Sequence, residues 1–193
     1  ASDVYKRQTL ANVPEIIEKG SAWFAAIGTE KNTGTKVYTI SGDVVNPGLI
    51  EVDMGTTLND IIFKYAGGIK NGKKFKAALI GGAAGAIVSE KGLAGRMDYD
   101  SLGEYAAVLG SGAVLVMDET RDVFDVLSST MKFFTHESCG KCSPCRIGTI
   151  MLEKLSNKIN SGKGNEKDWN MMNELSYNMK LTSFCPLGQS PYI

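Results

Sequence analysis

The sequence predicts an α+β fold in two parts, a β-grasp domain followed by a small all-α helical bundle. Within residues 36–118, four strand-like stretches surround one short amphipathic helix, and the order strand–strand–helix–strand–strand suits a β-grasp arrangement. From Thr120 onward, apolar residues recur at spacings of three and four, which is typical of packed helices. We therefore expect a domain boundary near residue 120.

The first 34 residues are expected to form an N-terminal helix and a linker. The stretch "TLANVPEIIEKGSAWFAAIG" (9–28) reads as a helix that starts near Pro14 and ends at Gly28, whereas residues 1–8 fit no periodic pattern. The helix carries an apolar stripe made of Ile16, Ile17, Trp23, Phe24 and Ile27.

The predicted β-grasp domain covers residues 35–119. Its hairpin turns at "NPG" (46–48), and its helix begins with Thr57 three residues before Asp60, a spacing like that of a capping box. The expected elements are a hairpin over 36–54, a helix closed by Gly67 and Gly68, strands over 75–82 and 113–118, and a long loop between these two strands. The segment "GGAAG" (81–85) lacks the spacing of a phosphate-binding loop, so a glycine turn is favoured.

Residues 120–193 are expected to form the helical bundle. Three apolar stripes predict three helices, with a loop at 160–168 before the third. The Met-rich part of the third stripe is interpreted as core rather than as a metal site. The stripes are Val123, Phe124, Leu127, Met131 and Phe134; Ile147, Met151 and Leu155; and Trp169, Met172, Leu175 and Met179, and the Met-rich group consists of Met171, Met172 and Met179.

Composition and charge exclude several classes of protein. The 193 residues include 21 Lys and Arg and 21 Asp and Glu, so the net charge is zero and there is no basic field to attract nucleic acid. No apolar run approaches the roughly 20 residues needed to span a bilayer, and no secretory signal is recognisable. We therefore expect a cytoplasmic protein that inserts into no membrane and binds no nucleic acid.

The cysteines carry the strongest chemical signal. The stretch "ESCGKCSPCR" places Cys139, Cys142 and Cys145 at two-residue spacings, and only Cys185, followed by Pro186, lies elsewhere. This C-x2-C-x2-C pattern with a distant Cys-Pro is typical of a [4Fe–4S] cluster. Structural zinc sites usually pair two separate knuckles, but the spacing alone leaves a four-cysteine zinc site open as the alternative.

A helix, a loop and an antiparallel helix between Cys145 and Cys185 would return the fourth cysteine to the other three. The loop that carries the first three cysteines (139–145) is called the knuckle below. We expect Gly140 to give this loop the backbone freedom that its turn requires. His136 is more easily explained by local packing than as a ligand. Lys141 and Arg146 are either cations that favour a reduced cluster or ordinary surface charges, and the sequence does not separate these two interpretations.

At these residues the sequence resembles a known family. The blocks "HESCGKCSPCRIGT" (136–149) and "TSFCPLGQSP" (182–191) are similar to the flavoprotein subunit of NADH:quinone oxidoreductase and of NAD(P)-linked hydrogenases and formate dehydrogenases. Three further blocks agree in order, at residues 9–28, 38–52 and 109–119. The resemblance covers roughly residues 9–191 and does not separate the three parent complexes.

The resemblance implies a soluble-ligand-binding β-grasp domain, then a helical domain whose Cys139, Cys142, Cys145 and Cys185 hold a [4Fe–4S] cluster. In such subunits, which are NAD(P)H-oxidising enzymes, FMN takes hydride from NADH and the cluster relays single electrons to partner iron–sulfur subunits. Such a complex can be peripheral to a membrane.

The family's glycine-rich FMN- and NADH-binding segments have no counterpart here, so we expect a C-terminal fragment whose residues 1–34 are a remnant of the flavin domain. "ASDVYKRQ" (1–8) departs from the family's pattern and is expected to be foreign. The alternative is a non-catalytic β-grasp binding module with structural zinc.

Overall fold

The computed structural model describes residues 2–192, with side chains from residue 7 onward. The chain divides into two units, one ending at Thr120 and the other beginning at Arg121. Each unit is described separately below. Within the described residues, no helix has both the length and the apolar character needed to cross a bilayer.

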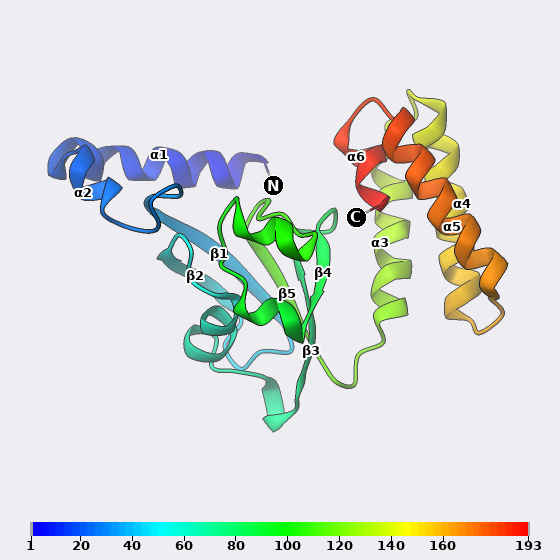
Figure 1. The fold of residues 1–193 in the computed structure, drawn as a ribbon, viewed down its shortest axis with the longest axis horizontal. Helices are drawn as coiled ribbons and strands as arrows, with labels where there is room; N and C mark the ends of the chain where they lie inside the picture. Colours follow the sequence, from blue (N-terminus) through cyan, green and yellow to red (C-terminus); the bar gives the residue numbers. More distant parts are fainter. Residues whose placement is uncertain (1, 193) are drawn as a thin grey trace. The chain divides into compact units, whose positions relative to one another are not determined.

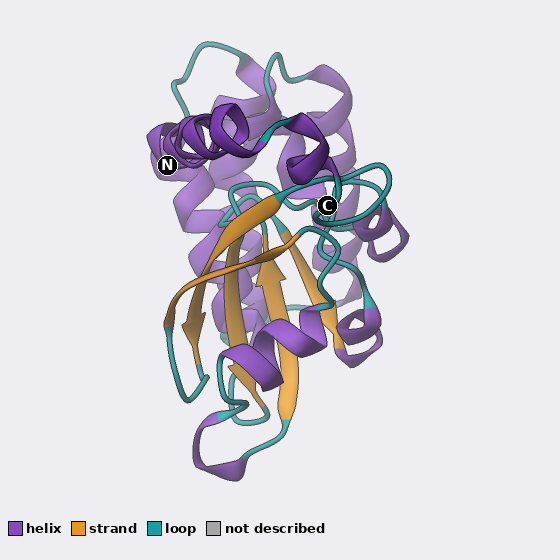
Figure 2. Cartoon of the chain, turned by 90° about the vertical axis from the view of Figure 1, so that its left-hand side faces the viewer, coloured by secondary structure: helices purple, strands orange, loops and turns teal. Residues whose placement is uncertain are grey.

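The first unit is built around one mixed sheet of five strands, which confirms the α+β fold class (Figures 1 and 2). The strand order is β2-β1-β5-β3-β4. The central strands β1 and β5 are parallel, and all other neighbours are antiparallel. The strands are β1 (Thr35–Gly42), β2 (Gly48–Asp53), β3 (Phe75–Ile80), β4 (Ala86–Ser89) and β5 (Ala113–Asp118).

Short helical segments connect these strands, and two helices precede them. Helices α1 (Ser2–Lys19) and α2 (Ser21–Ala25) come first. The π-helical segment η1 (Asp60–Tyr65) follows β2, and its start is capped by the Thr57 hydroxyl, which accepts a hydrogen bond from the Asp60 amide at 3.1 Å. The remaining 3₁₀ segments are η2 (Lys70–Gly72), η3 (Glu90–Ala94) and η4 (Ser101–Tyr105).

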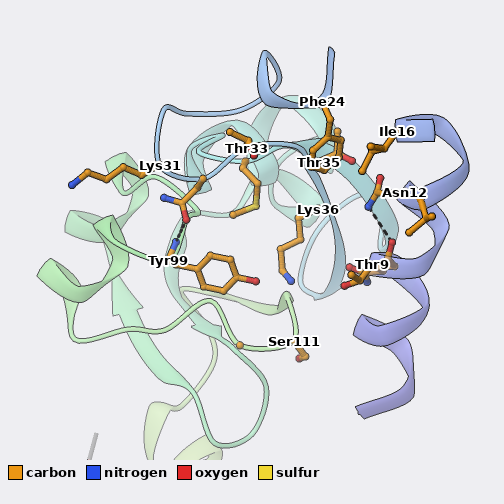
Figure 3. Close-up of a pocket in the computed structure, with 15 residues that line it drawn as sticks. Thr9, Asn12, Ile16, Phe24, Lys31, Thr33, Thr35, Lys36, Tyr99 and Ser111 are labelled. Carbon is orange, nitrogen blue, oxygen red and sulfur yellow. Dashed lines mark hydrogen bonds between the residues drawn. The ribbon is translucent and has the colours of Figure 1, made fainter. Parts of the chain in front are cut away.

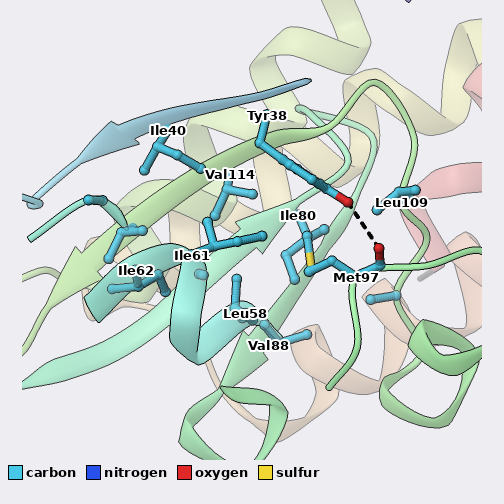
Figure 4. Close-up of a cluster of buried hydrophobic side chains, with 14 of the residues drawn as sticks. Tyr38, Ile40, Leu58, Ile61, Ile62, Ile80, Val88, Met97, Leu109 and Val114 are labelled. Atoms are coloured by element: carbon cyan, nitrogen blue, oxygen red, sulfur yellow. Dashed lines mark hydrogen bonds between the residues drawn. The ribbon is translucent and has the colours of Figure 1, made fainter. Parts of the chain in front are cut away.

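The core lies between the sheet and the η1 segment (Figure 4). Alternation along β1 places Tyr38 and Ile40 on the buried face, where they meet Ile61 and Ile62 of η1. All four side chains are at most 1% exposed. The Tyr38 hydroxyl donates to the Met97 carbonyl oxygen at 2.9 Å, so the one polar atom that this ring buries is satisfied.

The N-terminal helix differs from the prediction. It begins at Ser2 and contains Pro14, and Gly20, at φ 89°, separates it from α2. Proline lacks the amide hydrogen that bonds one turn back and crowds the preceding turn, so Pro14 weakens the helix locally, yet α1 continues through it to Lys19. Ile17 is 79% exposed, so the predicted apolar stripe does not form one buried face. Residue 1 lies outside the described residues.

Between β1 and β5, two predicted features are confirmed and one strand was not predicted. The hairpin over 36–54 is confirmed, because Thr35 pairs with Asp53 and Ile40 with Gly48 in an antiparallel register. "GGAAG" is confirmed as a turn, since Gly81 and Gly82 have φ of 94° and 92° and lead directly into β4. The strand β4 itself was not predicted, because Ala86–Ser89 is only four residues long and follows the glycines.

A hydrogen-bonded carboxylate closes the end of β5. Asp118 is 4% exposed, and one of its oxygens accepts bonds from the Thr120 hydroxyl at 2.5 Å and the Thr120 amide at 2.8 Å. Its other oxygen pairs with the Lys73 ammonium at 3.0 Å. The Thr120 hydroxyl, helped by Lys73, lowers the pKa of Asp118 from 3.8 to about 2, although burial opposes this shift.

Asp118 is therefore expected to stabilise the first unit in a pH-dependent way. Because its folded pKa lies below its unfolded value, its stabilisation is complete above about pH 4 and is lost as the pH falls toward about 2. Urea unfolding of the chain and of Asp118→Asn at several pH values tests this. The stability advantage of the natural chain should shrink between pH 5 and pH 2, and an equal advantage at both ends would contradict the assignment.

The second unit is helical. Helices α3 (Val123–Glu137), α4 (Ser143–Asn160) and α5 (Glu166–Thr182) pack in sequence order, and the short α6 (Pro186–Gln189) contacts all three before η5 (Ser190–Tyr192). Each long helix except α4 has a side-chain N-cap: Asp122 accepts from the Phe124 amide at 2.8 Å, and Asn165 forms a capping box with Asp168.

The three predicted helices are confirmed, but the buried face of α4 is not the predicted one. Ile147 and Met151 are 53% and 40% exposed. Small residues face inward instead, and a methyl group on Gly148 would lie 2.3 Å from the Met179 sulfur. Met172 and Met179 are buried as expected, whereas Met171 is 49% exposed. The inward-facing residues of α4 are Cys145, Gly148, Thr149, Leu152 and Ser156.

Candidate functional site

The ends of three helices form the surroundings of the cysteines. Helix α3 stops at Glu137 with Ser138 as its C-cap, and the chain then runs through Cys139 to Cys142, the N-cap of α4. Pro144 in the first turn of α4 fits this start, because its missing amide hydrogen has no intrahelical partner there. Cys145 lies in the same turn and is 4% exposed.

The fourth cysteine follows α5. The chain leaves α5 at Thr182, passes Ser183 and Phe184, and reaches Cys185, the N-cap of α6, with Pro186 next. The backbone amide of Phe184 is the main cause of the lowered pKa of Cys142. A methyl group on Gly188 would lie 3.0 Å from Cys145 Cβ, so the segment carrying Cys185 lies against the segment that carries the other three cysteines.

All four thiols are close enough to interact electrostatically. Burial raises the pKa of Cys145, the Ser138 hydroxyl counteracts this at 3.3 Å from the sulfur, and the negative charges of the other cysteines raise the pKa further. Cys142 and Cys145 are buried, while Cys139 and Cys185 are exposed, and none forms a disulfide.

Among the described side chains, from residue 7 to residue 192, no three His, Cys, Asp or Glu groups converge closely enough to hold one metal ion.

Local bonds hold the knuckle in its turn. Gly140 has φ 74°, the left-handed conformation that the sequence led us to expect. The exposed Arg146 side chain donates to the Gly140 carbonyl at 2.6 Å and to the Ser143 hydroxyl at 3.3 Å. Arg146 therefore has a specific structural partner. His136 and Lys141 are exposed.

Four residues around the cysteines were missed by sequence reasoning. The Ser138 hydroxyl lies beside Cys145 and accepts from the Gly140 amide at 3.4 Å. A methyl group on Gly188 would lie 2.5 Å from the Ser183 oxygen and 3.0 Å from Cys145 Cβ, so only glycine leaves this space open. The Phe184 amide is the fourth. The only clue to these residues in the sequence is that Ser138, Ser183 and Gly188 lie close to the cysteines along the chain.

The donor set fits an iron–sulfur cluster. Four thiols without competing carboxylate ligands are the soft donors that such clusters take. The Ser183 hydroxyl is buried and has no hydrogen-bond partner in the described part of the chain, which leaves a donor free toward the space beside Cys145. The close approach at Gly188 prevents a side chain from filling that space.

Two regions of the chain match known families. Residues 125–192 match the NADH-ubiquinone oxidoreductase-F iron-sulfur binding region, and residues 37–86 match the SLBB domain. The chain thus contains one region similar to an iron–sulfur binding region and one similar to an SLBB domain. Its relatives include F subunits of NADH-quinone oxidoreductase and a subunit of an NADP-reducing hydrogenase.

Curated relatives cover nearly all of this chain. It is 42% identical over 183 residues to the NADP-reducing hydrogenase subunit HndC of Solidesulfovibrio fructosivorans, and 39% identical over 181 residues to the NADH-quinone oxidoreductase F 2 subunit of Rhizobium meliloti. These alignments cover 95% and 94% of the chain but only 37% and 43% of the relatives. The chain therefore spans about two fifths of their length.

The solved structure of an NAD+-reducing [NiFe]-hydrogenase in the air-oxidized state is also similar. The TM-score is 0.84 at 32% sequence identity, and the similarity covers 96% of this chain and 31% of the hydrogenase chain. The fold, the family regions and the relatives agree with the resemblance noted in the sequence.

Proposed function

We propose that the chain is the electron-carrying part of an NAD(P)H-oxidising flavoprotein subunit. In this proposal Cys139, Cys142, Cys145 and Cys185 hold a [4Fe–4S] cluster. The observation that carries it is the close approach of Gly188, three residues after Cys185, to Cys145, since a methyl group on Gly188 would lie 3.0 Å from Cys145 Cβ. The match of residues 125–192 to an iron-sulfur binding region supports it as well.

A bound [4Fe–4S] cluster supplies one-electron transfer, and the protein supplies ligation, burial and orientation. The buried Cys142 and Cys145 would hold the side facing the helices, and the exposed Cys139 and Cys185 the side facing solvent. The Ser138 and Ser183 hydroxyls and the Phe184 amide are the groups placed to hydrogen-bond sulfur. Such bonds raise the reduction potential by stabilising added negative charge.

The proposed pathway extends beyond this chain. Single electrons would come from FMN, reduced by NAD(P)H in a part of the subunit that this chain does not contain. They would leave toward iron–sulfur subunits of a complex I-like or hydrogenase complex. The names of the relatives support this, since they include both a hydrogenase subunit and NADH-quinone oxidoreductase subunits. A cytoplasmic complex, peripheral to a membrane in the quinone-reducing case, would suit that role.

We also propose the finer domain assignment: an N-terminal segment over 1–34, a β-grasp SLBB domain over 35–119 and a cluster domain over 120–193. The parallel central pair β1 and β5, with an antiparallel hairpin on each side, supports the β-grasp assignment. The approach of α6 to α3, α4 and α5 supports a bundle whose helix ends enclose the cysteines.

Anaerobic reconstitution of the chain with iron and sulfide tests the proposal. We expect about four irons per chain and a broad visible absorbance that dithionite bleaches. A chain with all four cysteines replaced by alanine is the control and should stay colourless. A colourless natural chain that instead binds one zinc per molecule would contradict the electron-carrying function and favour a non-catalytic binding module.

A further inference from the structure

A cavity of about 950 Å³ lies in the first unit, beside the start of β1 and away from the cysteines (Figure 3). Helix α1 forms one wall, and the Gln8 amide donates to the Val37 carbonyl at 3.5 Å to join this helix to the sheet. Gly110 and Ser111, which precede β5, form another wall, and Tyr99 also lines the cavity. The iron–sulfur proposal assigns no role to these side chains.

The unusual group in this cavity is Lys36. Alternation along β1 places it on the same face as Tyr38 and Ile40, and it is only 8% exposed. Its side-chain stem lies against Gly112, where an added methyl group would be 3.1 Å from Lys36 Cε. Figure 3 shows the side chain pointing into the cavity.

The Lys36 ammonium has no hydrogen bond or ion pair within the described part of the chain. The ammonium is not fully enclosed, because the side chain points into the cavity, but a largely buried cation without a protein partner still loses part of its hydration. Burial accordingly lowers the pKa of Lys36. An anion bound in the cavity would remove this cost, because it would supply both the opposite charge and the missing hydrogen-bond acceptor.

The rest of the lining favours an anion with an apolar body. None of the described side chains that line the cavity is acidic, and a second lysine, Lys31, lies at its edge. Ser111 and Tyr99 add hydroxyl groups near Lys36. Ile16, Phe24 and Met54 add apolar surface to the lining. Pockets of this kind, mostly apolar with a few convergent polar groups, are typical small-molecule sites.

We propose that this cavity binds a small organic anion, with its carboxylate or phosphate group on Lys36 and its apolar part against Ile16, Phe24 and Met54. The site is independent of the cluster, so the iron–sulfur proposal and this one can fail separately.

Calorimetric titration of the full chain with benzoate and with phenyl phosphate tests the site and separates the two head groups. At least one should bind, whereas neutral benzyl alcohol should bind at least about tenfold more weakly. Lys36→Met should weaken binding of the anion at least about tenfold. The matched control is Lys91→Met, which removes an exposed lysine outside the cavity and should change binding less than about twofold.

Melting temperature provides a second readout that does not depend on weak binding signals. The anion should raise the melting temperature of the natural chain and not that of the variant. If Lys36→Met fails to fold, Lys36→Gln replaces it. The proposal is overturned if neither anion binds the natural chain, or if both bind the variant equally well.

Discussion

Replacement of Cys185 by alanine is expected to convert a four-iron cluster into a three-iron species. The three remaining thiolates of the knuckle would still hold three corners, while the fourth iron would lose its protein ligand and dissociate. Iron analysis should fall from about four to about three per chain, and the oxidised protein should show the EPR signal of a [3Fe–4S] cluster.

Phe184→Ala is a matched control for this change. The Phe184 side chain is 86% exposed, and its contribution to Cys142 comes from the backbone amide, which alanine keeps. The control should therefore retain four irons. An unchanged four-iron EPR signal in Cys185→Ala would show that the fourth ligand is another group.

Gly188→Ala is expected to disturb the same site without removing any ligand. The added methyl group would lie 2.5 Å from the Ser183 oxygen and 3.0 Å from Cys145 Cβ, both in the packed region beside the cysteines. The φ of Gly188 is not in the left-handed region, so the effect is steric. Overpacking of this kind costs about 1–3 kcal/mol of unfolding free energy. Cluster content after reconstitution should fall as Cys145 moves.

Urea unfolding and iron analysis measure both effects. Gly103→Ala is the control, because an added methyl group there meets nothing within 4 Å. The double variant Ser183→Gly/Gly188→Ala removes the atoms that the new methyl group would meet first, and it should recover part of the loss. A single Gly188→Ala variant with natural stability and natural iron content would contradict the close approach.

Much of the fold could be predicted because periodicity and turn residues agree with it. The hairpin over 36–54 alternates and contains a Pro-Gly turn, and β5 is a continuous apolar run that is buried in the sheet. The strand β4 could not be predicted from its four residues, because its structure depends on hydrogen bonds to β3 rather than on its own composition.

The buried face of α4 was missed for a different reason. The periodic pattern of large apolar residues predicted that Ile147 and Met151 are buried, but both are exposed. The helix instead turns Gly148 and Thr149 inward, since close approach to α5 requires small residues at that position. Contacts between helices decide such a choice, and they involve residues far apart in the chain.

The cysteine ligands could be proposed from spacing alone, but their surroundings could not. No pattern links Ser138 or Gly188 to Cys145, since these contacts arise only when α3, α4 and α6 come together. Lys36 had a weak signal, because strict alternation with Tyr38 and Ile40 places it on the inward face. A lysine at the end of a strand is usually exposed, so its sequence position did not predict a cavity.

The unequal burial of the four thiols has a practical consequence for handling the protein. Before metal is bound, Cys139 and Cys185 are open to solvent, whereas Cys142 and Cys145 are 9% and 4% exposed. Dissolved oxygen and peroxide attack accessible thiols first, and two such thiols per molecule allow chains to cross-link. Material purified in air would thus form reducible dimers and larger species through these two positions, which then cannot accept iron.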